Sequence, residues 1–177
     1  MALYDTSAGR PHPSVSLDTV PPRDVERPGF LVDLRRCIGC HACSVACKTA
    51  HAIPLGEFPL RVRWLPRPDE KTFAFVPVFS ESRCTNDAES LSAGLEPACV
   101  RACPTAALVF GDLADPEDAI HGAIAELEAT RLEAPDADDL KRDVHYVELE
   151  DFVSGKIHRG AQLDPRDEDP IYEQEGR

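Results

Sequence analysis

The stretch "CIGCHACSVACK", residues 37–48, places four cysteines at positions 37, 40, 43 and 47. Three thiolates at this C-x2-C-x2-C spacing can wrap one corner of an iron–sulfur cubane, and a fourth after x3 ligates a second cluster when two are present. Zinc sites instead separate pairs of ligands by a long loop. The spacing therefore favours iron–sulfur chemistry over a zinc site or a set of unligated thiols.

A second copy of the motif follows in "RCTNDAESLSAGLEPACVRACPT", residues 83–105. Its close, Cys-x3-Cys-Pro, is that of a bacterial ferredoxin motif, in which the last cysteine ligates the cluster of the other motif. Crossed ligation of this kind divides the cysteines between two sites. The first site, a [4Fe–4S] centre, takes Cys37, Cys40, Cys43 and Cys103, and the second takes Cys47, Cys84 and Cys99.

Asp87 stands where the second site lacks a cysteine. A carboxylate is a harder ligand than a thiolate and holds iron less firmly in a sulfur-rich site. The second site is then expected to carry a [3Fe–4S] cluster or an Asp-ligated [4Fe–4S] cluster. The alternative is that Asp87 is a plain turn residue and that the site holds no cluster. The three cysteines at suitable spacing favour a cluster.

Other residues near the motifs have less specific patterns. His41, inside the first motif, is expected to face solvent or to bond to cluster sulfur, because the cysteine set is complete without it. We expect Trp64 in the core rather than as an electron relay, and His51 carries no pattern. Three cations flank the first motif, where they could raise the cluster potential, help a partner to dock or serve only as surface residues: Arg35, Arg36 and Lys48.

Composition limits both the core and the fate of the cysteines. The chain has 177 residues, of which 42% are hydrophobic and 6% aromatic, together with 16 prolines. A core built from so little apolar material benefits from a metal-based brace. Seven cysteines cannot all pair within one chain, and no export signal precedes them, so we expect thiolates that serve a metal rather than disulfides.

Charge is distributed unevenly along the sequence. The first 110 residues carry equal numbers of acidic and basic side chains, so the net charge of −13 lies wholly in residues 111–177. This balance speaks against nucleic acid and against an anionic membrane surface as partners. The acidic half is expected to be a solvated surface or a docking arm for a larger subunit.

No apolar run approaches the roughly 20 residues that a membrane-spanning helix needs. The first residues, "MALYDTSAGRPHPSVSLDTVPPRD", lack a basic region, an apolar region and a twin-arginine pair. We therefore expect a cytoplasmic location and no membrane span in this chain.

The fold class expected is α+β. Apolar runs at 29–34 and 106–113 predict strands, 59–66 and 71–79 a hairpin, and 145–149 a last strand. A short helix is expected over 44–52, and an amphipathic helix over 114–132 with Asp115 as N-cap and Pro116 in the first helical position. The last cysteine of each motif should begin a helix.

The expected units are an extended arm (1–28), a two-cluster, bacterial ferredoxin-like domain (29–113), an acidic helix plus strand (114–149) and a polar acidic tail (150–177).

Residues 30–113 resemble the iron–sulfur (beta) subunits of molybdopterin oxidoreductases of the dimethyl sulfoxide reductase family. "CIGCHACSVACKTAHAIPLGEFPLRV" is similar to their first cysteine motif, and "RCTNDAESLSAGLEPACVRACPTAALVFGDLADPED" to their last, whose longer middle loop accounts for the x11 gap. Those subunits generally carry four motifs and four clusters, whereas this chain has only the first and last motifs. In the family these two motifs share ligands, which implies the same division of the cysteines.

The resemblance implies a non-catalytic subunit that relays single electrons between a large molybdopterin-type catalytic subunit and another redox partner. It leaves open whether a membrane-anchor subunit or another electron carrier completes the assembly. Two alternatives remain at the level of sequence: a free soluble ferredoxin, and an iron–sulfur redox sensor whose labile Asp87 site reports oxygen or iron. The sequence shows no pattern typical of a general base, a nucleophile or a substrate pocket, so no catalytic residue is assigned.

Overall fold

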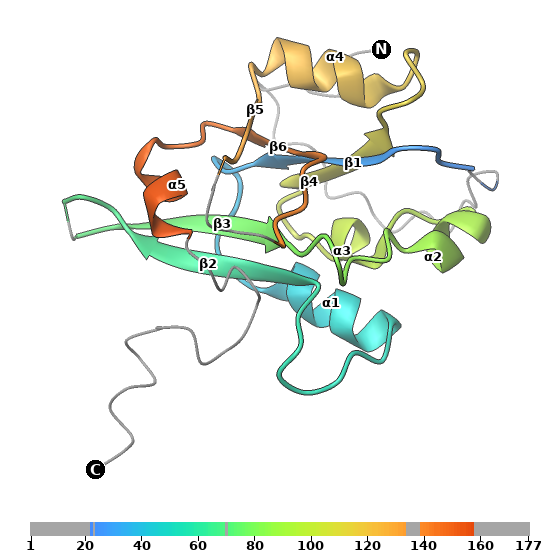
Figure 1. The fold of residues 1–177 in the computed structure, drawn as a ribbon, viewed down its shortest axis with the longest axis horizontal. Helices are drawn as coiled ribbons and strands as arrows, with labels where there is room; N and C mark the ends of the chain where they lie inside the picture. The colour runs from blue at the N-terminus through green and yellow to red at the C-terminus, as the bar shows by residue number, and fades with distance from the viewer. Residues whose placement is uncertain (1–21, 23, 70, 134–138, 158–177) are drawn as a thin grey trace.

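A computed structural model describes residues 22, 24–69, 71–133 and 139–157. Its helices and strands form three layers, and the middle layer is a four-stranded sheet in the order β4-β1-β6-β5 (Figure 1). The sheet strands are β1 (Pro28–Asp33), β4 (Leu108–Asp112), β5 (Thr130–Arg131) and β6 (Val144–Val147). Most of the expected arm (1–28) and of the expected tail (150–177) lies outside the described residues.

Strand β1 lies inside the sheet and brings distant parts of the sequence together. It pairs antiparallel with β4, with Phe30 opposite Phe110, and parallel with β6, with Phe30 opposite Val144. Successive side chains of a strand point to opposite faces, and both faces are covered here, because Leu31 and Val32 are each fully buried. The strand expected over 29–34 is therefore confirmed, and its continuous apolar character follows from burial on both sides.

One face of the sheet is covered by a hairpin of β2 (Leu60–Pro66) and β3 (Phe73–Phe79), which pair antiparallel with Leu60 opposite Phe79. The predicted hairpin is thus confirmed. The rings of Phe30 and Phe79 lie 4.7 Å apart between the two layers. The buried Tyr146 hydroxyl donates a hydrogen bond of 2.8 Å to the Pro77 carbonyl, which ties β6 to the hairpin.

The opposite face is covered by α4 (Ala119–Glu126) (Figure 1). Its Ile120 and Ala123 pack against Leu31. The helix is shorter than the predicted 114–132, and the predicted N-cap is wrong. Asp118 is the N-cap, and its carboxylate accepts from the N–H groups of Ile120 and Asp112, both at 2.9 Å. The second of these donors lies at the end of β4, so a tertiary contact decides where the helix begins.

The remaining helices are α1 (Ala42–Ala50), α2 (Ala88–Ser92), α3 (Ala98–Arg101) and α5 (Phe152–Lys156). The helix expected over 44–52 is confirmed as α1. The expectation that the last cysteine of each motif begins a helix is wrong, because Cys47 lies inside α1 and Cys103 follows α3. Helices α2 and α5 were not predicted, and α5 buries Val153 against the core.

The sheet joins two of the units that were expected from the sequence. Residues 114–149 add β5 and β6 to the sheet that holds β1 and β4, so they share a core with the cysteine-bearing residues. In the described part of the chain, no helix has the length and apolar character needed to cross a bilayer.

Candidate iron–sulfur centres

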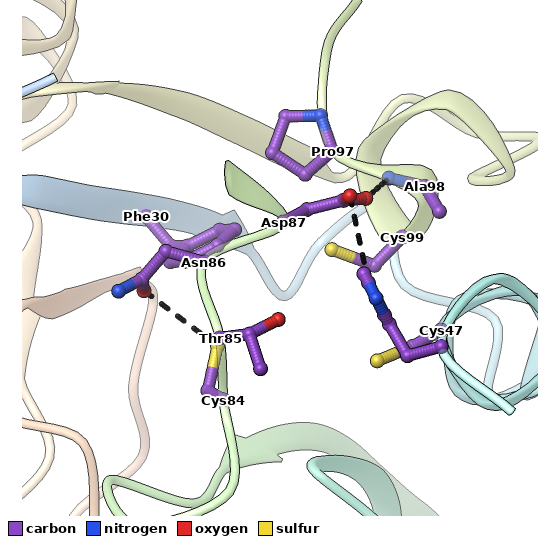
Figure 2. Close-up of a pocket in the computed structure, with 10 residues that line it drawn as sticks. Phe30, Cys47, Cys84, Thr85, Asn86, Asp87, Pro97, Ala98 and Cys99 are labelled. Atoms are coloured by element: carbon purple, nitrogen blue, oxygen red, sulfur yellow. Dashed lines mark hydrogen bonds and ion pairs between the residues drawn. The ribbon is translucent and has the colours of Figure 1, made fainter. Parts of the chain in front are cut away.

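The seven cysteines form no disulfide and line two cavities. One cavity has about 300 Å³ of empty space and the other, shown in Figure 2, about 260 Å³. Among the described residues, no three His, Cys, Asp or Glu side chains form a group that could hold a single metal ion. The first cavity is lined by Cys37, Cys40, Cys43 and Cys103, and the second by Cys47, Cys84, Cys99 and Asp87.

These two groups are the sets that crossed ligation predicts. Cys103 comes from the second motif and joins the first cavity, whereas Cys47 comes from the first motif and joins the second cavity. Helices α1 and α3 carry the buried Cys43 and Cys99, one from each set. The assignment of the cysteines as cluster ligands stays a prediction, for which this grouping is the structural basis.

The first motif follows a loop with backbone in the left-handed region. Gly39 has φ 69° and His41, the N-cap of α1, has φ 60°. Burial raises the pKa of the Cys37 and Cys84 thiols, and the nearby backbone of Gly39 and of Asn86, respectively, opposes the rise. N–H groups directed at sulfur stabilise thiolate and tune an iron–sulfur cluster.

Cys103 receives a similar contact from the residues that follow it. The Ala107 N–H donates to its Sγ at 3.2 Å, and the Thr105 hydroxyl lies 3.6 Å from the same sulfur. Ala106 adopts φ 49° between them, which directs the backbone toward the cysteine again. The cysteine sulfurs surround a cavity instead of converging on one metal ion, and N–H groups lie near them. This arrangement fits an iron–sulfur cluster.

Trp64 was expected in the core, and this expectation is wrong. The residue is 47% exposed, and its indole N–H donates a hydrogen bond of 3.2 Å to the Gly39 carbonyl. Its ring stands edge-on to Phe75, with centroids 5.2 Å apart. Trp64 therefore covers the loop of the first motif from outside, because an indole needs a partner for its N–H as well as an apolar surface.

The pKa values of the buried thiols are raised by burial and by neighbouring cysteines, most of which belong to the same set. Burial raises the pKa of Cys43 to about 12, and Cys103 adds to the rise. Burial also raises the pKa of Cys47 to about 11, with Cys84 the next cause. The pKa of Cys99 is raised by burial first and then by Cys84, Cys47 and Cys43. Helices α1 and α3, which carry Cys43 and Cys99, contact each other, so the two sites approach each other there. Because thiolates bind metal, iron must displace these protons when it binds.

Asp87 is buried at the edge of the second cavity, with φ 55° and 6% exposure. It is the N-cap of α2: one oxygen accepts from the Ser90 N–H at 3.3 Å, and the other accepts from the Ala98 N–H at 2.6 Å. Burial raises its pKa, but the bonds from Ala98 and Ser90 and the nearby His51 outweigh burial and leave the pKa below its ordinary value. Both carboxylate oxygens are thus engaged by backbone donors.

His51 is the residue in this cavity that sequence reasoning missed. It is the C-cap of α1, its side chain is 17% exposed, and its Nε2 lies 3.5 Å from Asp87 Oδ1. The signal that could have found it is its position four residues after Cys47, since residues four apart share one face of a helix.

The cations around the first motif have local partners. Arg35 forms two hydrogen bonds of 2.9 Å with the buried Asp33 carboxylate. Lys48 donates to the carbonyls of Pro54 and Glu57, at 2.6 and 2.5 Å, and lies over the Phe58 ring. These contacts give Arg35 and Lys48 a structural role, in which they hold the loops beside the first motif.

Residues 36–107 match the family model of the 4Fe-4S dicluster domain. They form a ferredoxin-type 4Fe-4S domain. The match includes all seven cysteines and supports iron–sulfur clusters as the cofactor of this region.

Curated relatives confirm the resemblance to iron–sulfur subunits. A protein of Halobacterium salinarum named as a dimethyl sulfoxide reductase iron–sulfur subunit is 32% identical over 103 residues, which are 57% of this chain and 37% of that protein. A polysulfide reductase chain of Wolinella succinogenes is 33% identical over 98 residues, which are 53% of this chain and 39% of that protein. The present chain thus spans well under half the length of these two relatives.

The beta subunit of formate dehydrogenase from Megalodesulfovibrio gigas is 26% identical over 194 residues, covering 64% of this chain and 90% of that protein. The alignment is longer than the whole chain of 177 residues although it uses only part of it. That relative therefore has a stretch with no counterpart here.

Proposed function

We propose that this chain is a non-catalytic subunit that relays single electrons between a molybdopterin-type catalytic subunit and a second redox partner. The observation that carries the proposal is the gathering of seven cysteines around two cavities within the region that matches the 4Fe-4S dicluster domain. Iron–sulfur clusters accept and release one electron at a time when bound in such a site.

The ligand sets proposed follow the cavities. A [4Fe–4S] cluster is held by the four cysteines of the first cavity. A second cluster, either [3Fe–4S] or a [4Fe–4S] whose fourth iron is bound by Asp87 or another group, is held by the three cysteines of the other cavity. These residues are Cys37, Cys40, Cys43 and Cys103 for the first site and Cys47, Cys84 and Cys99 for the second.

The protein positions and buries the two proposed cluster sites and sets the route of the electron between them. Apolar side chains such as Val62 and Leu108 line part of the first cavity, and Phe30 lines part of the second. Cys40 is exposed, so the first site reaches the surface there, whereas Cys43 and Cys99 are buried where the two sites approach each other. Electrons would then cross from one site to the other near this inner pair.

The names of the relatives favour a subunit over a free ferredoxin or a sensor, because all three describe one component of a multi-component reductase or dehydrogenase. The stretch of the formate dehydrogenase protein without a counterpart here is what a chain reduced to the first and last motifs would lack. A cytoplasmic location stays a prediction.

The test is to purify the tagged full-length chain anaerobically from its native cells and to measure iron, sulfide and molybdenum in each size-exclusion fraction. We expect the chain to elute in an assembly much larger than its 19.4 kDa, together with molybdenum. Elution at its own mass without molybdenum would contradict the subunit proposal and support a free ferredoxin.

The number of clusters is obtained from iron analysis and EPR of the isolated chain before and after reduction. About eight irons per chain indicate two cubanes, and about seven indicate a [3Fe–4S] beside a [4Fe–4S]. About four irons with a single signal would reduce the chain to a one-cluster bridge. A chain without iron would overturn the proposed function.

A further inference from the structure

We propose that the fourth protein ligand of the second cluster is the imidazole of His51, held in place by the Asp87 carboxylate. This inference rests on the proposed function, since it needs a cluster in the second cavity. It assigns different tasks to the two residues: His51 binds iron, and Asp87 is a positioning residue.

The first step of the argument concerns the carboxylate. Asp87 Oδ2 accepts a short bond of 2.6 Å from the buried Ala98 N–H, and Oδ1 accepts from the Ser90 N–H. These bonds fasten the first residues of α2 and α3, and Ala98 immediately precedes the candidate ligand Cys99. If Asp87 turned to bind iron, buried backbone donors would lose their acceptors beside that ligand, which is unfavourable.

The second step concerns the position of the imidazole. His51 follows Cys47 by four residues, and its N–H bonds to the Cys47 carbonyl at 3.1 Å, so both side chains leave the same face of α1. Both side chains line the second cavity together with Cys84 and Cys99. A ligand at His51 therefore needs no rearrangement of the helix that already supplies Cys47.

The third step concerns chemistry. Histidine bound to a metal almost always directs its other ring N–H at a carboxylate or carbonyl, which fixes the tautomer and makes the ligand more basic. His51 Nε2 lies 3.5 Å from Asp87 Oδ1, which supplies such a carboxylate and leaves the other ring nitrogen for iron. Imidazole is an established iron ligand in iron–sulfur centres and raises their potential relative to an all-cysteine site.

The experiment uses the full chain, purified anaerobically and labelled with 15N-histidine, with pulsed EPR of the paramagnetic second cluster and iron analysis as readouts. The wild type is expected to show about eight irons and a strong coupling to histidine nitrogen. His51→Ala should lose the coupling and one iron, giving about seven irons and an oxidised [3Fe–4S] signal. His51→Cys should keep about eight irons without the nitrogen coupling, because a thiolate then completes the site.

The matched control is His121→Ala, which removes a histidine of α4 that lines neither cavity. It should leave the nitrogen coupling and the iron content unchanged. Asp87→Asn should keep the coupling but weaken retention of the fourth iron, as expected of a positioning residue.

Four results would overturn the inference. A wild type with about eight irons and no histidine coupling would point to Asp87 or solvent as the ligand. A wild type with about seven irons would leave no fourth iron to bind. With about four irons, the second cavity holds no cluster and the inference fails, while electron transfer through the first site stands. A chain without iron would overturn both proposals.

Discussion

His145 shows how one buried side chain can make stability depend on pH. It lies on β6 with 9% exposure, its Nε2 accepts from Arg131 Nε at 3.3 Å, and its Nδ1 is buried without a hydrogen-bond partner among the described residues. Burial lowers its pKa, followed by the positive charge of Arg131; Asp143 opposes this, while Arg27 and His121 add to it. The folded protein therefore takes up this proton less readily than the unfolded protein does.

The sign of the effect follows from linkage. An unfolded histidine gains its proton near the ordinary pKa of 6.5, whereas the folded form gains it only at lower pH, so acidification between these values favours unfolding. We predict that the free energy of unfolding falls as pH decreases from about 7 to 5 and that His145→Asn flattens this dependence. Denaturant unfolding at a series of pH values checks it. Parallel pH profiles for the two proteins would contradict the prediction.

Gly39 governs the loop element of the first motif. A Cβ at this position would lie 2.6 Å from Phe75 Cδ1, and φ is 69°, a conformation that costs an L-residue about 1 kcal/mol. Gly56 offers a matched control, because its φ is 85° but a Cβ there would meet nothing within 4 Å.

We predict that Gly39→Ala loses the first cluster and so about half of the iron, because the Phe75 ring must move and the loop that carries Cys40 must follow it. Gly56→Ala should lower the melting temperature slightly and keep its iron. Iron analysis and EPR of the two variants check the prediction. Equal iron in both variants would show that the close approach at Gly39 is unimportant.

The start of α4 is a second test at the scale of elements. The Asp118 carboxylate accepts from two backbone N–H groups, at Ile120 and at Asp112, whereas the Asp115 carboxylate accepts from that of Glu117 at an exposed turn. Loss of an N-cap costs about 1 kcal/mol. We predict that Asp118→Ala lowers the free energy of unfolding by at least about that amount and that Asp115→Ala changes it by less than half as much. Denaturant unfolding checks this, and the reverse order would restore the cap expected from sequence.

For the whole molecule, the central prediction is crossed ligation between the two motifs. Cys103→Ala should abolish the [4Fe–4S] signal of the first site although residues 37–48 are intact. Cys47→Ala should spare that signal and remove the second cluster, although the substitution lies within the first motif. EPR and iron analysis of both variants check the prediction. The opposite pattern would mean that each motif serves its own cluster.

Much of the candidate site could be predicted from sequence because ligand chemistry is local. Cysteine spacing carries the division into two sets, and the structure gathers those same sets around two cavities. The role of Trp64 and the presence of His51 in the second cavity could not be predicted. Whether a side chain is covered depends on what folds over it, and Trp64 faces the Gly39 loop rather than the core.

The sequence by itself determined β1, β4, β6, the hairpin and the cofactor class, since apolar alternation and thiolate spacing express backbone geometry and metal chemistry over short distances. It did not predict β5, which lies inside the stretch expected to be helical. Only the tertiary structure decided that β1 lies between β4 and β6, that Asp118 rather than Asp115 caps α4, and that Asp87 is engaged by Ala98 and faces His51. The place of β1 and the contacts of Asp87 depend on partners from other elements, and the cap of α4 depends on Asp112 at the end of β4, so packing of the layers decides each of them.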